Sequence, residues 1–379
     1  MRIGIMTQPL FCNYGGIIQC YALQTVLKRL GHETIILQRE FKKKYTIKGA
    51  CIYYAKHIIK LLLGIQSSWH YYVDQKKLDY IAQNTYKFID NNINPRSKKC
   101  YSTEELQKVV NELNLNAIIV GSDQVWRPNY SPCLPNYFLN FLGEDHTIKR
   151  ISYGASFGTD KWTYSKELEK DCKVLLNKFD AVSVREHSAA KLCKNHFGVE
   201  ATVCLDPTLL LEKEDYISIF GKRNTCRGDL FCYVLDRTQW KKNIIQRIVE
   251  VTGYSSFESM PELSDTVYNI NKDIERCVYP PAEEWLAAFN EAKMILTDSF
   301  HGTVFSIIFN KPFWVIGNKG RGMTRFDTIL SEFGLKDRLI TPETLDSIDF
   351  NASIDWKHIN NIKKKLQEDS LLFLEKSLE

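Results

Sequence analysis

The sequence predicts an α/β protein in which two parallel sheets face each other across a cleft. Short apolar runs alternate with segments of helical period, and this alternation restarts after residues 206–216, "DPTLLLEKEDY". The apolar runs end in polar or glycine residues, as strands do at the ligand-binding edge of a parallel sheet. The chain has 379 residues, 44% hydrophobic and 25% charged, and this length and composition suit two soluble domains.

The first predicted domain covers residues 1–207. It opens with an apolar strand at 2–6 and a helix at 17–31, which Gly31 is placed to end. Residues 41–113 are rich in lysine and tyrosine and show no clear strand pattern, so we expect a helical insertion that covers this domain. The remaining strands are predicted at 33–37, 116–123, 150–156, 180–186 and 200–208.

The second predicted domain covers residues 208–352 and repeats the α/β pattern. Its strands are expected at 230–235, 293–298 and 312–317, and its helices at 238–253, at 281–292 and directly after His301. Residues 353–379 form one further amphipathic helix. The apolar residues of that helix are Trp356, Ile359, Ile362, Leu366, Leu371 and Leu374.

Charge and cysteine content exclude several classes of function. The net charge of +5 comes from 50 basic and 45 acidic residues without an arginine-rich arm, so a nucleic-acid partner is not expected. The eleven cysteines form no CxxC pair, which argues against a zinc ribbon and a disulfide framework. We therefore expect no metal, no cofactor and a reducing, cytoplasmic location. The start "MRIGIMTQ" lacks the pattern of a signal peptide.

The longest apolar stretch, residues 52–64, is interrupted by two lysines and is shorter than the roughly 20 residues that span a bilayer. It follows the basic sequence "KKKY". One interpretation is a helix that lies on the inner face of the membrane, which would make the protein a peripheral membrane protein. The other is a buried or capping helix.

His301 lies at the exit of the strand at 293–298 and in the first turn of the next helix. A helix N-terminus stabilises anions through its free amides, and Gly302 would let a ligand approach the backbone closely. Asp298 and Ser299 are also good helix caps. The alternative is therefore a capped helix with a structural histidine.

Other strand exits carry polar residues that suit a binding cleft. Arg185 could grip phosphate or carboxylate, or form a salt bridge. Asp123 could act as a base or orient a sugar hydroxyl, and helix capping is the alternative. The start of the first helix and the exit before Asp123 add Asn13, Tyr14, Gly15, Gln19 and Ser122. Neither a GxGxxG nor a P-loop pattern is present.

A glycine-rich loop, "GNKGRGMTRF", follows the strand at 312–317. It carries Lys319, Arg321 and Arg325 beside the strand that leads to His301. A loop of this type is a weak signal by itself, and its position next to His301 gives it weight.

Six segments together resemble the polysaccharide pyruvyl transferase family, from the first strand to about residue 326. They are "NYGGIIQCYALQTVLKRLG", "VGSDQVW", "SYGASFG", "SVRE", "LDPTLLL" and "DSFHGTVFSIIFNKPF". The resemblance implies two Rossmann-like domains in a GT-B-like arrangement. It also implies transfer of a pyruvyl unit from phosphoenolpyruvate to two hydroxyls of a sugar, giving a ketal. The first domain would hold the acceptor and the second the donor.

The resemblance places the family's catalytic histidine at His301 and its arginine at Arg185, and Ser156 lies in another shared segment. Some members have an arginine where this chain has Ser299, so Arg321 or Arg325 would have to bind the donor phosphate. The acceptor would be a sugar, free or lipid-linked. Two alternatives stay open, a glycosyltransferase that uses a nucleotide sugar and a carbohydrate-binding protein without activity. The acceptor sugar and the oligomeric state stay undetermined.

Overall fold

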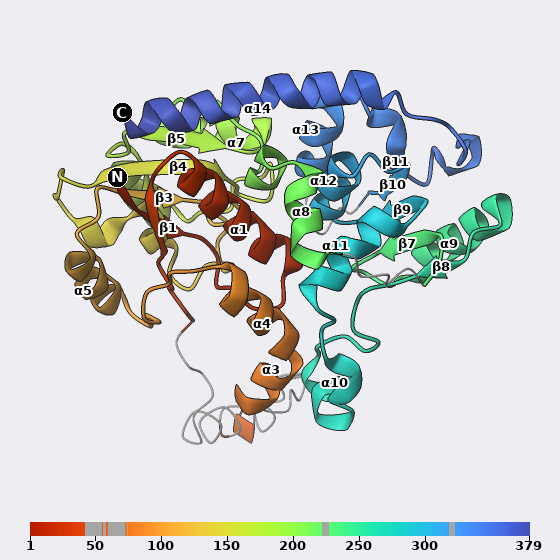
Figure 1. Cartoon of the computed structure of the whole chain (residues 1–379). Helices are drawn as coiled ribbons and strands as arrows, with labels where there is room; N and C mark the ends of the chain where they lie inside the picture. Colours follow the sequence, from red (N-terminus) through yellow and green to blue (C-terminus); the bar gives the residue numbers. More distant parts are fainter. Residues whose placement is uncertain (42–54, 56–57, 60–72, 74, 222–226, 318–322) are drawn as a thin grey trace.

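The computed structural model describes residues 1–41, 55, 58–59, 73, 75–221, 227–317 and 323–379 (Figure 1). Two parallel sheets form the two halves of the molecule, and helices cover both. The predicted GT-B-like arrangement of two Rossmann-like halves across a cleft is therefore confirmed. The predicted domain limits at residues 207 and 352 stay predictions.

The first sheet has the strand order β2-β1-β3-β4-β5-β6, and its neighbouring strands pair in parallel. Strand β3 and residues 3–6 of β1 are apolar and buried, as strands of a parallel sheet between helices must be. The strands are β1 (Arg2–Met6), β2 (Glu33–Ile36), β3 (Ala117–Val120), β4 (Lys149–Ala155), β5 (Ala181–Val184) and β6 (Thr202–Val203).

Two helices of this half, α5 and α6, begin at serine caps that the sequence supplies. Ser102 accepts a hydrogen bond from the Glu105 amide at the start of α5, and Ser165 does the same for the Leu168 amide at the start of α6. The helices are α1 (Tyr14–Arg29), α3 (Gln75–Ile81), α4 (Gln83–Asn92), α5 (Thr103–Leu113), α6 (Lys166–Leu176) and α7 (His187–Leu192). Short turns of helix occupy η1 (Leu134–Phe138), η2 (Asn140–Leu142), η3 (Cys193–Phe197) and η4 (Pro207–Leu210).

The second sheet has the order β11-β10-β9-β7-β8, again parallel. Its strands are β7 (Leu230–Tyr233), β8 (Ser256–Phe257), β9 (Met294–Thr297), β10 (Phe313–Ile316) and β11 (Leu339–Ile340). The helices around it are α8 (Lys213–Phe220), α9 (Gln239–Thr252), α10 (Val267–Lys272), α11 (Ala282–Glu291), α12 (Phe300–Ile308) and α13 (Thr324–Glu332). Short helical turns are η5 (Glu275–Cys277), η7 (Lys336–Arg338) and η8 (Leu345–Ser347).

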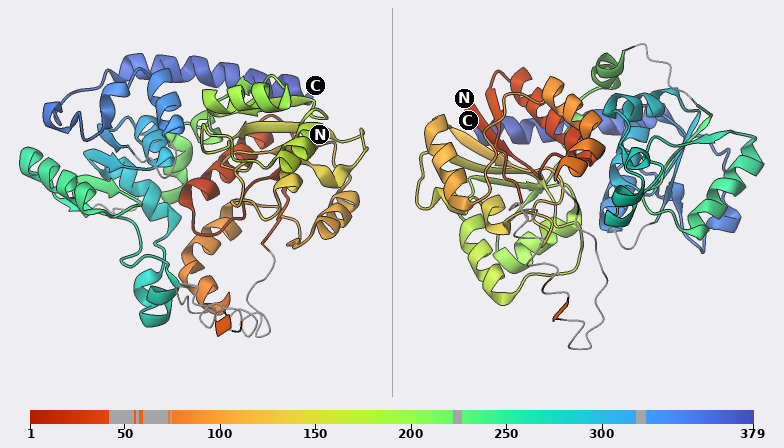
Figure 2. Two further views of the ribbon diagram at one scale, coloured as in Figure 1. Left: turned by 180° about the vertical axis from the view of Figure 1, so that it is seen from behind. Right: turned by 90° about the horizontal axis from the view of Figure 1, so that it is seen from below.

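Helix α14 (Trp356–Leu378) carries the chain back from the second half to the first, so that the two termini lie close together (Figures 1 and 2). Its Gln367 side chain donates a hydrogen bond to the Leu209 carbonyl at 2.6 Å, and the Leu205 amide donates to Ser370 Oγ at 3.0 Å. Leu374 on the same helix is fully buried. The C-terminal helix thus belongs to the packing of the first half.

A second connection joins the halves at α3, α4 and α10, which lie side by side in Figure 1. The Tyr279 amide donates to the Ile81 carbonyl at 2.9 Å, and Asn84 Nδ2 donates to the Tyr279 carbonyl at 2.9 Å. Apolar contact supports these bonds, because Ile81, Ile270 and Cys277 are buried in one cluster. We call this contact the inter-domain bridge.

Part of the predicted insertion at residues 41–113 is visible as α3, α4 and α5. The apolar stretch at 52–64 lies almost entirely outside the described residues. Among the helices that the structure describes, none combines the length and the apolar character needed to cross a bilayer.

Candidate active site

A cavity of about 730 Å³ lies in the cleft between the two halves. The first half contributes Asp123 and Arg127 to its lining, and the second contributes Ser299, His301 and Arg325. The strand exits that the sequence predicts as a site are therefore brought together from both sheets.

His301 is positioned by the first turn of α12. Ser299 is the N-cap of this helix, and its Oγ accepts the Gly302 amide at 3.5 Å. The imidazole is buried, and its Nε2 lies 3.8 Å from Asp206 Oδ2, a distance that makes the pair an electrostatic contact and not a hydrogen bond. A Cβ on Gly15 would lie 2.0 Å from His301 Nδ1, so the start of α1 must have glycine there.

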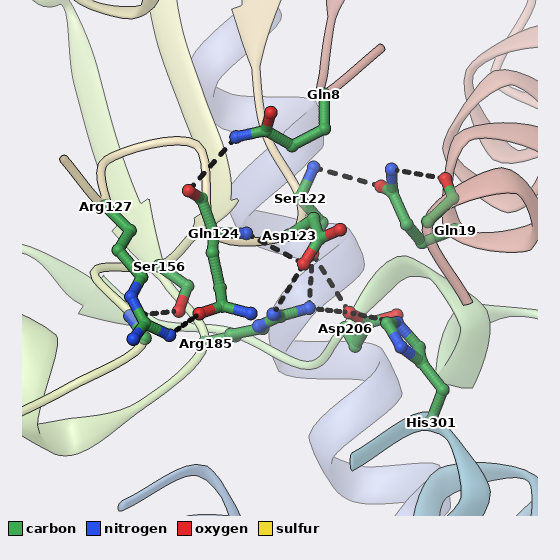
Figure 3. Close-up of polar contacts among 12 residues, drawn as sticks. Gln8, Gln19, Ser122, Asp123, Gln124, Arg127, Ser156, Arg185, Asp206 and His301 are labelled. Atoms are coloured by element: carbon green, nitrogen blue, oxygen red, sulfur yellow. Dashed lines mark hydrogen bonds and ion pairs between the residues drawn. The ribbon is translucent and has the colours of Figure 1, made fainter. Parts of the chain in front are cut away.

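Asp206 connects the polar groups of the site (Figure 3). Its Oδ2 accepts hydrogen bonds from Ser122 Oγ at 2.9 Å and from Arg185 at 2.8 Å, while its Oδ1 accepts from the Thr208 hydroxyl at 2.7 Å. Burial alone would raise the pKa of this carboxyl, but His301, Arg185 and Thr208 together hold it well below its usual range. Asp206 therefore stays a carboxylate facing His301.

Arg185 is fully buried behind the cavity and contacts three carboxylates. Its guanidinium lies 2.8 Å from Asp206, 3.3 Å from Asp123 and 3.8 Å from Glu186. It also lies over the ring of Phe300, 4.7 Å from the centroid. The guanidinium that was expected to bind a substrate anion is thus paired with the protein's own carboxylates. The structure therefore agrees with the alternative of a salt bridge, except that the ion pairs are buried and do not lie on the surface.

Asp123 follows β3 in a left-handed conformation with a φ of 69°, which aspartate tolerates better than most residues. One carboxylate oxygen lies 3.3 Å from Arg185, and the other accepts from Asn13 Nδ2 at 3.2 Å. Asn13 is the N-cap of α1, yet its side chain makes no capping bond. Its amide points to Asp123, so it orients this carboxylate at the cavity.

Gln19 and Ser122 form a buried layer behind Asp123. Gln19 Nε2 donates to Thr7 Oγ1 at 2.7 Å and to the Gly16 carbonyl at 2.9 Å, and its Oε1 accepts the Ser122 amide at 3.1 Å. Both side chains are fully enclosed. We infer that they position Asp123 and Asp206 and do not touch a ligand in the cavity.

Ser156 follows the C-terminal end of β4 and forms a hydrogen bond with Glu186. Its hydroxyl donates to Glu186 Oε1 at 2.6 Å and accepts the Gly158 amide at 2.9 Å. Burial raises the pKa of Glu186, although Arg185 and Ser156 oppose this effect. The hydrogen-bonded pair of Ser156 and Glu186 therefore lies next to the guanidinium of Arg185, 3.8 Å from Glu186.

Arg325 lies at the start of α13, is buried, and lines the cavity. Its guanidinium is 5.8 Å from the Phe300 ring centroid, on the ring that Arg185 also contacts. Burial lowers the pKa of Arg325 to about 10, and the like charge of Arg185 adds to this shift. An incoming anion would relieve that repulsion. Lys319 and Arg321 of the same loop lie outside the described residues.

Two expected ligand residues have packing roles. The Tyr14 hydroxyl donates to the Pro280 carbonyl at 2.6 Å and its ring stacks on Trp285, so it joins the two halves. A Cβ on Gly302 would lie 2.1 Å from Thr297 Oγ1. The expectation that Gly302 admits a ligand to the backbone is therefore corrected, because this glycine makes room for the end of β9.

A family model described as polysaccharide pyruvyl transferase matches residues 13–320 of this chain. The chain belongs to this family. Membership supports a transferase that acts in polysaccharide modification. Among curated proteins, no sequence matches the chain.

Several solved structures are similar to this family member in overall fold. The UDP-GlcNAc 2-epimerase of Methanocaldococcus jannaschii, with UDP-GlcNAc and UDP, is 13% identical over 97% of this chain and 100% of that one, with a TM-score of 0.47. The Neisseria meningitidis UDP-GlcNAc 2-epimerase, bound to UDP-GlcNAc, is 11% identical over 98% and 100%, with a TM-score of 0.46. Arabidopsis thaliana UGT89C1, complexed with UDP-L-rhamnose, is 8% identical over 98% of each chain, with a TM-score of 0.49. The architecture rests on the two parallel sheets and not on these likenesses.

Two residues of this polysaccharide pyruvyl transferase family member were missed as site residues, Asp206 and Glu186. Both lie at the C-terminal ends of predicted strand segments, Asp206 in 200–208 and Glu186 in 180–186, so their position at a strand exit was the available signal. Their pairing with Arg185 could not be found from spacing, because it depends on strands β3, β5 and β6 lying in one sheet edge.

Within the described residues, no group of three histidine, cysteine or carboxylate side chains is placed to hold a metal ion. The described cysteines are free thiols, most of them buried. Several of them pack in the cores, as Cys204 and Cys232 do next to β6 and in β7.

Proposed function

We propose that the protein transfers a pyruvyl group from phosphoenolpyruvate to two hydroxyls of a sugar and forms a pyruvate ketal. The observation that carries this proposal is the composition of the cleft. One cavity is lined by His301, which lies next to the buried Asp206 carboxylate, by the carboxylate of Asp123, and by the buried Arg325. These are the groups that a reaction with an anionic donor and two proton transfers requires.

The donor would bind on the second half, near α12 and α13. Phosphoenolpyruvate carries a phosphate and a carboxylate, and Arg325 is the buried cation that this half presents to the cavity among the residues described. The first amides of α12 add positive potential at the same place. Arg325 would thus supply the charge that Ser299 lacks.

The reaction would proceed in two steps. In the first, one sugar hydroxyl adds to C2 of phosphoenolpyruvate, Asp123 accepts the hydroxyl proton, and His301 delivers a proton to C3, which becomes a methyl group. In the second, the other hydroxyl attacks C2, the C2–O bond to phosphate breaks, and inorganic phosphate leaves while the hydroxyl proton passes to a base. The products of the two steps together are the pyruvate ketal of the sugar and inorganic phosphate.

Asp206 and Arg185 would support these steps without touching the substrates. The Asp206 carboxylate lies 3.8 Å from Nε2 and would position the imidazole of His301 for the first step. Arg185 lies between Asp206 and Asp123 and offsets the repulsion of the two carboxylates. Arg185 thus links Asp123, the proposed base, to Asp206, the carboxylate next to the proposed acid His301.

Thermal stabilisation by phosphoenolpyruvate tests the donor without a known acceptor. We expect phosphoenolpyruvate to raise the melting temperature of the wild type, and Arg325→Gln to lose at least half of that shift. Arg338→Gln is the matched control, because Arg338 is also a buried arginine but binds the carbonyls of Ala352 and Ser353. Stabilisation by UDP or UDP-glucose, and none by phosphoenolpyruvate, would favour a nucleotide-sugar transferase and overturn the proposal.

A further inference from the structure

The cavity holds more than the donor, since cavities of roughly 300–1,000 Å³ accommodate drug-sized molecules and phosphoenolpyruvate is much smaller. The part that the donor does not use is lined by the first half of the chain. We call this part the acceptor wall; it comprises Glu40, Asp79, Tyr86, Lys99, Arg127 and Tyr130. No step of the proposed reaction employs these six side chains.

Tyr130 is the most exposed ring of this wall, with 46% of its surface accessible. Its ring lies 4.2 Å from the Arg127 guanidinium, which is itself fixed by a 2.8 Å hydrogen bond to Gln124 Oε1. Gln8 Nε2 in turn donates to the Gln124 carbonyl at 3.1 Å. The ring is thus held by a chain of polar contacts, which reduces the entropy lost when a ligand stacks on it.

A second ring, Tyr86, belongs to the same wall. It meets Phe11 edge-on with centroids 6.1 Å apart, and the Lys99 ammonium lies 5.8 Å from its centroid. Tyr86 is partly buried, and burial raises the pKa of its hydroxyl, with Asp79 and Glu40 adding to the shift. The hydroxyl stays protonated and can both donate and accept hydrogen bonds.

The charges of the two sides of the cavity differ. Among its described residues, the first half lines the cavity with three carboxylates, Glu40, Asp79 and Asp123, and two cations, Lys99 and Arg127. This near balance gives little attraction for an anion. On the donor side, Arg325 faces the cavity, and the one carboxylate described there, Asp298, is paired with Lys241. Rings, hydroxyls, amides and carboxylates in this proportion suit a neutral polyhydroxy ligand.

We propose that the acceptor wall binds a neutral sugar, whose apolar face stacks on Tyr130 and whose hydroxyls are oriented by Glu40 and Asp79 so that the reacting pair reaches Asp123. This inference rests on the proposed function, and it names the chemistry of the acceptor. It predicts that a uronic acid or a phosphorylated sugar is a poor acceptor.

Saturation-transfer NMR on the full chain with phosphoenolpyruvate present tests this assignment. The probes are the methyl glycosides of galactose, glucose, mannose and glucuronic acid. We expect at least one neutral glycoside to bind the wild type more tightly than the glucuronide does. Tyr130→Ala should weaken it about tenfold, and Tyr130→Phe should keep it within about twofold. Tyr268→Ala is the control, because Tyr268 is an exposed tyrosine on α10.

The outcomes separate this inference from the proposed function. If Tyr130→Ala binds the glycoside as Tyr268→Ala does, or if only the glucuronide binds, the acceptor wall is assigned wrongly while the donor proposal stands. Failure of every neutral glycoside to bind the wild type also overturns it. If phosphoenolpyruvate does not stabilise the wild type in the thermal assay, the proposed function itself fails.

Discussion

At the scale of single residues, Asp206 is the centre of the site. One carboxylate meets an arginine, a serine hydroxyl, a threonine hydroxyl and the edge of His301. Because Asp206 is buried and does not line the cavity, it is a positioning residue and not a catalytic one.

Asp206→Asn should reduce turnover while leaving donor binding in place. The amide keeps the size of the side chain but removes the charge beside His301, so we expect kcat to fall about 100-fold with the KM for phosphoenolpyruvate within about threefold. Phosphate release in the presence of an acceptor measures both. Asp215→Asn, which removes an exposed ion pair with Arg29, is the control and should retain normal turnover. Equal activity of the two variants would contradict the assignment.

The same residue makes stability depend on pH. The folded pKa of Asp206 lies below the unfolded value of about 3.9, so its carboxylate stabilises the fold above that value and this stabilisation is lost as pH falls. We expect the free energy of unfolding of the wild type to exceed that of Asp206→Asn most at pH 7, and the difference to shrink between about pH 5 and pH 3. Urea unfolding at several pH values measures it. A difference that grows on acidification would refute this explanation.

At the scale of elements, α14 contributes to a half of the molecule that lies far from it in sequence. Leu374 is fully buried against the first half, whereas Leu372, two residues earlier, is 47% exposed. The two leucines therefore provide a matched pair on one helix.

Leu374→Ala should lower the free energy of unfolding by about 2–4 kcal/mol, because it leaves a cavity between α14 and the first half. Leu372→Ala should change it by less than about 0.5 kcal/mol. Urea denaturation of both variants gives the comparison. Similar values for the two would mean that α14 is not docked as described.

The elements also show how far sequence reasoning reaches. The long strands and α1, α9, α11 and α12 match predicted segments, because each has several apolar residues at one period. Strands β8 and β11 were not predicted, since each has two residues and forms only because a neighbouring strand offers hydrogen bonds.

The site shows the same division. His301, Asp123 and Arg325 were predicted from their place after strands, and the structure brings them to one cavity. A salt bridge of Arg185 was considered, but its burial among three carboxylates was not predicted. The residues that surround it follow three different strands or begin helix α12, and they lie far apart in the sequence. A linear pattern carries no information on which of several charged residues pair.

At the scale of the whole molecule, one hydrophobic core extends through both halves. It includes Ile5 of the first sheet and Ile295 of the second, and Trp285 of α11 contacts both Tyr14 of α1 and Tyr233 of β7. The inter-domain bridge and α14 tie the halves at two further places.

The two halves should therefore unfold together. We expect one transition on heating, with coincident midpoints by far-UV circular dichroism, which follows the helices, and by near-UV circular dichroism, which follows the packed aromatic rings. Two separate transitions would show that the shared core contributes little to cohesion.

The inter-domain bridge has a consequence for exchanging parts between relatives. One of its bonds joins the backbone of Ile81 to that of Tyr279, so it does not depend on matching side chains, whereas the bond from Asn84 Nδ2 and the cluster of Ile81, Ile270 and Cys277 do. A chimaera that took its second sheet from another protein would keep that backbone bond and lose the fit of the cluster and of α14. Recombination should therefore succeed only when α3, α4 and α14 are exchanged together with the surfaces they cover.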